Sequence, residues 1–242
     1  MNTKRMLVVS AHAADFCSRA GGTIAKYASA GASVRILGLT CGERGESPDF
    51  WRQQPDATLE MAKETRITES TAAASALGAE IRFKDWGDYP LIFDKERLVE
   101  LAEEIRSATP DVILTHWPSA PYNQDHAYTT DAVIRACGLA AAAGLKTAHP
   151  SMRWPVIYFF EAGVPYTEFE GFLPDTYIDI TGAFEKKLQA LRLLKSQSQL
   201  PDWYSGYALQ RAHQARTFSG NPDIKYAEAF KRYRPLVTEF FP

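Results

Sequence analysis

The feature that most constrains the fold is a regular alternation of short apolar runs with longer segments of helical periodicity. Four apolar runs, each typical of a buried strand, lie at residues 6–11, 33–40, 80–86 and 111–116. Strands that alternate with helices of ten or more residues form parallel βαβ units, whose sheet is covered on both faces. The sequence therefore predicts an α/β protein with a Rossmann-like, mostly parallel sheet and helices on both faces.

The remaining segments fit the same architecture. Two further strands are expected, and the expected helices are more numerous. The strands are 154–161 and 176–180, and the helices are 23–32, 57–77, 98–108, 125–143, 183–197 and 224–233. The sequence contains no internal repeat, no low-complexity tract and no long linker, so we expect one domain that spans residues 1–242.

Composition and charge narrow the classes of partner. The formal net charge of −2 argues against nucleic-acid binding, which usually requires a basic excess. The apolar run near the N-terminus is too short for a signal peptide, and no apolar stretch is long enough to span a membrane. Three cysteines without CxxC spacing fit a reducing compartment. We therefore expect a cytoplasmic protein without a membrane partner, in which any anionic substrate meets locally placed arginines.

Histidines follow two of the predicted parallel strands. His12 comes directly after the first strand and His116 ends the fourth, so both belong to the carboxyl edge of the sheet, where such folds bind ligands. His126 opens the helix that follows, and Asp15 lies three residues after His12. His12, Asp15 and His126 together form the ligand set of a catalytic zinc site, which keeps a position open for water or substrate. Taken singly, each residue also fits a capping or surface role.

Four short motifs resemble those of the LmbE/PIG-L superfamily of zinc-dependent de-N-acetylases. They are SAHAADF, LTCGERGES, ETRITES and NQDH, and the resemblance covers nearly the whole chain. It implies that His12, Asp15 and His126 bind one divalent metal, in the first place Zn²⁺. It also implies a general base at position 14, where this chain has Ala14. The resemblance therefore implies that the chain keeps the metal ligands but lacks the hydrolytic base. General-base help of this kind contributes about 10²–10⁴-fold in rate.

A branch of the superfamily shares this departure. The motifs SAHAADF, GERGES, DWGDYPL and KYAEAF together resemble the 4-oxalomesaconate hydratase branch. The resemblance implies a metal-dependent addition of water to the C=C bond of 4-oxalomesaconate or a similar unsaturated oxo acid, and a homo-oligomer. The substrate would then be a small anionic di- or tricarboxylate. Two alternatives stay open: a zinc-dependent de-N-acetylase acting on an amino sugar or related amide, and a non-catalytic binding protein.

The loop after the second strand supplies the candidate acid/base groups. Glu46 resembles the glutamate of the GERGES motif that is catalytic in the hydratase branch. Glu43 is expected to position other groups. As an alternative, both glutamates could simply be solvated residues of the loop. His213 is the candidate for a second acid/base group. His116 is expected to line the site or to steady a ligand, with a core position as the alternative.

Binding several carboxylates calls for arginine, whose planar guanidinium forms bidentate hydrogen bonds with such groups. Arg66 occupies the place where the superfamily has a substrate-contacting arginine, and Arg216 is the next candidate. Arg44, which adjoins Glu46, completes the expected set, with a solvated surface position as the alternative. Asp88, in the segment WGDYP, could orient a ligand or stabilise a turn.

Overall fold

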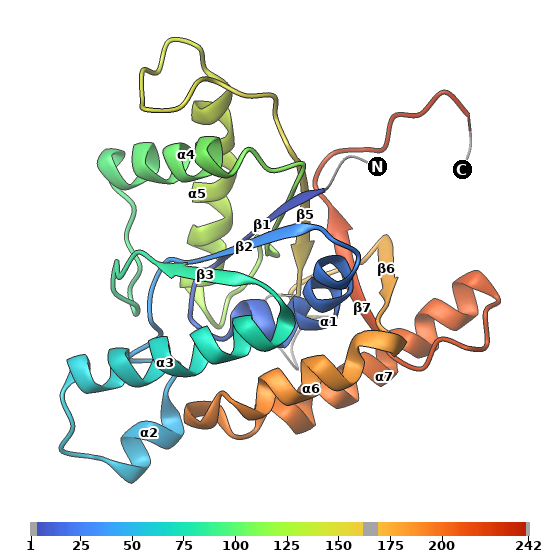
Figure 1. Ribbon diagram of the computed structural model, residues 1–242, viewed down its shortest axis with the longest axis horizontal. Helices are drawn as coiled ribbons and strands as arrows, with labels where there is room; N and C mark the ends of the chain where they lie inside the picture. Colours follow the sequence, from blue (N-terminus) through green and yellow to red (C-terminus); the bar gives the residue numbers. More distant parts are fainter. Residues whose placement is uncertain (1–3, 162–168, 241–242) are drawn as a thin grey trace.

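The computed structural model describes residues 4–161 and 169–240, and their strands form one seven-stranded sheet of order β3-β2-β1-β4-β5-β7-β6 (Figure 1). The five strands from β3 to β5 in this order are parallel, and β7 pairs antiparallel with both β5 and β6. The predicted mostly parallel sheet is thus confirmed. The strands are β1 Arg5–Ser10, β2 Ser33–Gly38, β3 Glu80–Phe83, β4 Val112–His116, β5 Val156–Phe160, β6 Thr176–Asp179 and β7 Ala227–Arg232.

Helices cover both faces of the sheet, as predicted. Figure 1 shows α4 and α5 on one side and α1, α3, α6 and α7 on the other. The helices are α1 Asp15–Ser29, α2 Pro48–Gln53, α3 Leu59–Leu77, α4 Lys95–Ala108, α5 Gln124–Ala141, α6 Phe184–Arg192 and α7 Leu200–Ser219, with short 3₁₀ turns η1 Thr181–Ala183 and η2 Lys195–Gln197. No helix in the described ranges is both long enough and apolar enough to cross a membrane.

The central strand β1 shows why the sheet is buried on both faces. Met6 and Val8 point into the core beneath α1, α3 and α6, whereas Leu7 and Val9 point into the core beneath α4 and α5. All four side chains are nearly inaccessible. Because successive side chains of a strand alternate between faces, a strand buried on both sides reads as a continuous apolar run.

The C-terminal segment 224–233 corrects the sequence prediction. It was expected to be a helix, but residues Ala227–Arg232 form β7, between β5 and β6. Its alanine, glutamate and lysine residues favour a helix locally, yet the hydrogen bonds of two neighbouring strands and burial on both faces decide the outcome. The prediction 183–197 was also too long, since α6 ends at Arg192. The helices α2 and α7 were not predicted.

Candidate metal centre and active-site cavity

The site lies where the direction of strand order changes, between β1 and β4. In such sheets a crevice opens at the carboxyl ends of the two strands. His12 follows β1, His116 is the last residue of β4, and His126 lies in the first turn of α5. The fold therefore brings together three histidines that the sequence places at strand and helix ends.

His12, Asp15 and His126 are buried, and their ligand atoms lie within 4.8 Å of one another. Asp15 stands between the histidines, with Oδ2 3.4 Å from His12 Nδ1 and Oδ1 3.7 Å from His126 Nε2. Neither of these two nitrogens makes a hydrogen bond with any described residue. A buried polar atom left in this state costs about 1–3 kcal/mol, which a bound cation would offset. The donor set and its unused nitrogens therefore fit a divalent metal.

Asp125 fixes the orientation of His12. Its Oδ2 atom lies 3.2 Å from His12 Nε2, and the carboxylate accepts backbone hydrogen bonds from Tyr89 and Leu91, each at 2.9 Å. With Nε2 directed at Asp125, the Nδ1 atom of His12 faces Asp15 and the cluster. A carboxylate that holds a ligating imidazole in this way is a common partner of metal sites. No role in the site was predicted for Asp125, and its place next to His126 was the one available signal.

The electrostatics of the cluster differ between its two histidines, His12 and His126. Burial alone would lower the pKa of His12, but the hydrogen bond with Asp125 and the nearby Asp15 carboxylate, 3.4 Å from Nδ1, raise it to about 10. Burial and the neighbouring His116 instead hold the pKa of His126 well below its usual 6.5. For Asp15, burial works in the opposite direction, but the charge of Arg19 contributes to a pKa well below the usual range. Without metal, the His12 ring is thus in its cationic form, and a metal that binds it would displace one of the two ring protons. His126 is neutral and Asp15 is ionised, so both could accept a metal without losing a proton.

His116 lies behind the ligands rather than in the cavity. Its Nε2 atom accepts a hydrogen bond from the backbone N–H of Ala11 at 3.0 Å, and its ring stacks on His126 with centroids 4.1 Å apart. Burial lowers the pKa of His116 to about 4, so the ring is neutral. These contacts fit the expected role of steadying a ligand.

The loop after β2 places Glu46 beside the cluster. Gly42 adopts φ +68°, a conformation that favours glycine, and its Cβ position would lie 3.3 Å from His12. Asp88 accepts backbone hydrogen bonds from Arg44 and Gly45 at 2.8–3.0 Å, so its turn-stabilising role is the one the contacts support. The loop brings Glu46 Oε1 to 3.9 Å from His12 Nδ1.

Three donors hold the Glu46 carboxylate. The Oε1 atom accepts from Asn123 Nδ2 at 3.1 Å and from the Tyr89 hydroxyl at 3.3 Å. The Oε2 atom accepts from Gln197 Nε2 at 2.7 Å. All three groups come from other parts of the chain, and none was predicted from the sequence. Together they fix the orientation of the carboxylate.

A cavity of about 220 Å³ opens beside these groups. Its wall includes Ala14, Asp15, Arg19, Glu46 and His126. Arg19 is the one arginine or lysine among the described residues of the wall, and its Nη1 atom bonds Asp15 Oδ1 at 2.7 Å. The described cavity wall therefore combines two of the candidate metal ligands, Asp15 and His126, with the carboxylates of Glu46 and Glu170 and one guanidinium, and the side chain at position 14 is inert.

Two predicted substrate arginines do not line this cavity. Arg66 is fully buried, and its guanidinium bonds Gln197 at 2.7 Å and Glu69 at 3.1 Å. Arg44 is directed to Glu43 and Asp88 instead. Arg19 was the missed cation; the signal was its place one helical turn after Asp15.

The buried Glu43 likewise lies outside the described cavity wall. Its carboxylate accepts from Arg44 at 3.0 Å, and its backbone carbonyl accepts from the indole of Trp51 at 2.7 Å. These contacts agree with a positioning role for Glu43 in the loop.

His213 and Arg216 also lie away from the cavity. The cavity reaches α7 at Leu200, Trp203 and Tyr204, and His213 follows Tyr204 by more than two helical turns. His213 is exposed, and Arg216 donates to the backbone carbonyl of Ile224 at 2.6 Å.

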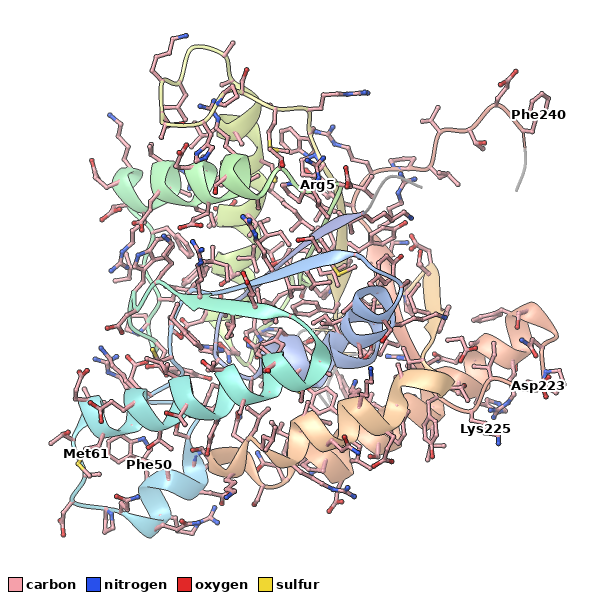
Figure 2. All side chains as sticks on the ribbon, viewed as in Figure 1. Arg5, Phe50, Met61, Asp223, Lys225 and Phe240 are labelled. Atoms are coloured by element: carbon pink, nitrogen blue, oxygen red, sulfur yellow. The ribbon has the colours of Figure 1, made fainter. Side chains whose placement is uncertain are left out.

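Figure 2 shows where the segment that Arg216 contacts lies in the whole molecule. Asp223 and Lys225, which flank Ile224, lie at the opposite end from Phe50 of α2. The structure thus does not support the predicted roles of His213 and Arg216 in the cavity.

Comparison with known proteins gives two groups of relatives. Residues 7–137 match the family described as PIG-L, GlcNAc-PI de-N-acetylase. The chain is 40% identical over 244 residues to the 4-oxalmesaconate hydratase of Pseudomonas putida KT2440, and the match covers 99% of this chain and 93% of that relative. It is 36% identical over 181 residues to a 1D-myo-inositol 2-acetamido-2-deoxy-alpha-D-glucopyranoside deacetylase of Rhodococcus erythropolis, a match to 64% of this chain and 62% of the deacetylase.

Solved structures repeat this pattern. The crystal structure of GalB, the 4-carboxy-2-hydroxymuconate hydratase from P. putida KT2440, matches with a TM-score of 0.93 and 39% identity, over 99% of this chain and 100% of that chain. The N,N'-diacetylchitobiose deacetylase of Pyrococcus horikoshii matches with a TM-score of 0.76 and 22% identity, over 96% of this chain and 84% of that chain, which establishes a shared fold.

Proposed function

The chain belongs to the PIG-L family of GlcNAc-PI de-N-acetylases, and we propose that it is a metal-dependent hydratase that adds water to the C=C bond of 4-oxalomesaconate or a similar unsaturated oxo acid. The likeness to the P. putida hydratase extends over nearly the full length of both chains, which supports this proposal. The more partial likeness to deacetylases supports the shared fold and ligand set.

One observation carries the proposal: the wall beside the metal ligands has Glu46 but no carboxylate at position 14. Ala14 lines the cavity and cannot accept a proton, whereas Glu46 lies 3.9 Å from the ligand atom of His12. An acid/base group is thus present, but not in the place from which the family's deacetylases activate water. This arrangement favours the addition of water to a C=C bond over the hydrolysis of an amide.

We assign the proton transfers to Glu46. As the oxygen of water bonds to one alkene carbon, Glu46 accepts the proton that this water loses. The electron pair of the C=C bond passes toward the adjoining oxo group, and the other alkene carbon then receives a proton. The proton held by Glu46 is the one that this carbon needs, so one carboxylate suffices for both transfers.

His12, Asp15 and His126 would hold the metal, for which we propose Zn²⁺. Bound there, Zn²⁺ would supply the Lewis acidity for polarising the oxo group of the substrate. Arg19 binds a substrate carboxylate from the cavity wall, because a guanidinium offers several N–H donors in one plane. The substrate class is therefore a small di- or tricarboxylate.

The first test is an ultraviolet assay of zinc-loaded protein with 4-oxalomesaconate. Loss of the conjugated chromophore that stops on chelation and returns with added metal is the expected result. An E46Q variant with full metal content should lose about 10²–10⁴-fold in rate. Persistent absorbance with metal-loaded wild-type protein would refute the proposed substrate, and an amide substrate would then be assayed next.

A further inference from the structure

The side chain of Gln197 lies between Arg66 and Glu46 and bonds both. Arg66 Nη2 donates to Gln197 Oε1 at 2.7 Å, and Gln197 Nε2 donates to Glu46 Oε2 at 2.7 Å. Gln197 is buried and Arg66 fully so. A continuous chain of hydrogen bonds therefore runs from a buried guanidinium to the carboxylate on the cavity wall.

The chemistry of the Arg66, Gln197 and Glu46 side chains sets the direction of both hydrogen bonds. A guanidinium can donate but cannot accept, so the amide must turn its oxygen toward Arg66. Its NH₂ group then necessarily faces Glu46, as a donor to a carboxylate. An aliphatic residue at position 197 could make neither bond, and a carboxylate there would repel Glu46. Because Arg66 fixes the amide orientation, Glu46 receives a donor in one defined place.

The backbone that carries Gln197 is held from both sides. Glu69 of α3 accepts from the backbone N–H and the hydroxyl of Ser196, each at 3.0 Å, while it also binds Arg66. Asp49 of α2 accepts from the backbone N–H of Ser198 at 2.7 Å. The residues before and after Gln197 are thus anchored, so the amide has little freedom to move away from Glu46.

We propose that Arg66 and Gln197 are positioning residues that hold the Glu46 carboxylate in the geometry needed for proton transfer. This inference rests on the proposed function, in which Glu46 transfers the proton. Arg66 acts on catalysis through Gln197 and makes no contact with substrate. The inference thus replaces the predicted anion-binding role of this arginine with one that its observed contacts support.

The first experiment compares Q197L with Q210L, a matched control on the exposed surface of α7. Since displacing a catalytic group by about 1 Å can cost about 10²-fold in rate, we expect kcat of Q197L to fall about 30- to 100-fold, with KM changed less than about 3-fold. Metal content and melting temperature are measured for both variants. A Q197L enzyme that keeps wild-type kcat with its metal bound would overturn the proposal.

A second variant of nearly equal size guards against misfolding. Q197E places a carboxylate in contact with Glu46, and two adjacent carboxyl groups resist simultaneous ionisation. We expect the acidic limb of the kcat profile to move about one pH unit or more toward higher pH. A residue with a purely structural role would leave this limb where it is, and that result would overturn the proposal.

Arg66 is tested in combination with Gln197. R66M should lower kcat by itself, but add less than about 3-fold in the Q197L background, because both residues act along one path. R66K, which keeps a donor, should recover part of the loss. Additive effects would contradict the proposed path.

The E46Q variant separates the proposed role of Glu46 from the proposed positioning role of Gln197 and Arg66. If E46Q retains hydration, the proposed role of Glu46 fails and the positioning role fails with it. If E46Q loses hydration while Q197L retains it, the positioning role alone fails.

Discussion

Replacing Asp125 by asparagine tests how the metal ligands are oriented. The carboxylate accepts three hydrogen bonds: Oδ1 from the Leu91 backbone, and Oδ2 from the Tyr89 backbone and His12 Nε2. An amide has one acceptor oxygen, so one of its two orientations must be chosen. If the oxygen faces His12, the NH₂ group confronts the backbone N–H of Leu91.

In the other orientation the NH₂ group faces His12 and the N–H of Tyr89. His12 Nε2 must then accept, which places the remaining ring proton on Nδ1, the atom that faces the metal cluster. Either orientation leaves a buried N–H without an acceptor, at a cost of about 1–3 kcal/mol in the free energy of unfolding. Loss of a carboxylate partner of a ligating histidine lowers metal affinity about 10–100-fold, equivalent to about 1.4–2.7 kcal/mol.

The affinity of D125N for Zn²⁺ is measured by competition with a chromophoric chelator, and its stability by thermal unfolding with and without chelator. The control is D131N, since Asp131 lies on the same helix with an exposed side chain that is 3.4 Å from Arg135. D131N should match the wild type in both measurements. If D125N bound zinc within about 3-fold of the wild-type affinity, the assigned orientation of His12 would be wrong.

Three further outcomes are expected. A14D should gain measurable amide hydrolysis on a small N-acetylated amino sugar, because it supplies the missing base; product analysis showing no acetate would contradict this. R106M should lower the free energy of unfolding by more than about 3 kcal/mol in urea titrations, because Arg106 is buried and binds five backbone carbonyls near the end of α5; a smaller loss would mean that water replaces it. The pKa of His12, raised to about 10, means that zinc binding at pH 7 should release about one proton from this residue and that apparent affinity should rise with pH; calorimetry in buffers of different ionisation enthalpy would contradict this if no proton were released.

Local sequence patterns determined most of the fold. Apolar runs such as that of β1 predicted buried strands because a strand covered on both faces has no need for polar alternation. The helical segments between them required parallel connections, and hence a common carboxyl edge. Positions at that edge, such as His12 and His116, could be assigned to the site from the chain order alone. The segment 224–233 failed because its helix-forming residues are outweighed by strand pairing in β7.

The supporting groups of the site could not be predicted in this way. Asp125 bonds His12 across 113 positions of the chain, and Gln197 bonds Glu46 across 151. No periodicity or spacing links residues so far apart, because their contact depends on how helices and loops pack at the sheet edge. Arg66 illustrates the consequence: its residue type and its place in the family's motif suggested an anion binder, but its packing directs it to Gln197.

The sequence by itself therefore determined the parallel part of the sheet, its carboxyl edge and the residue types that gather there, since strand periodicity and residue chemistry are local properties. The tertiary structure alone decided which cation faces the cavity, which carboxylate orients His12 and which donors hold Glu46. These depend on directional hydrogen bonds, whose strength falls steeply with distance and angle. Such bonds are defined when packing has fixed the side chains to within a fraction of an ångström.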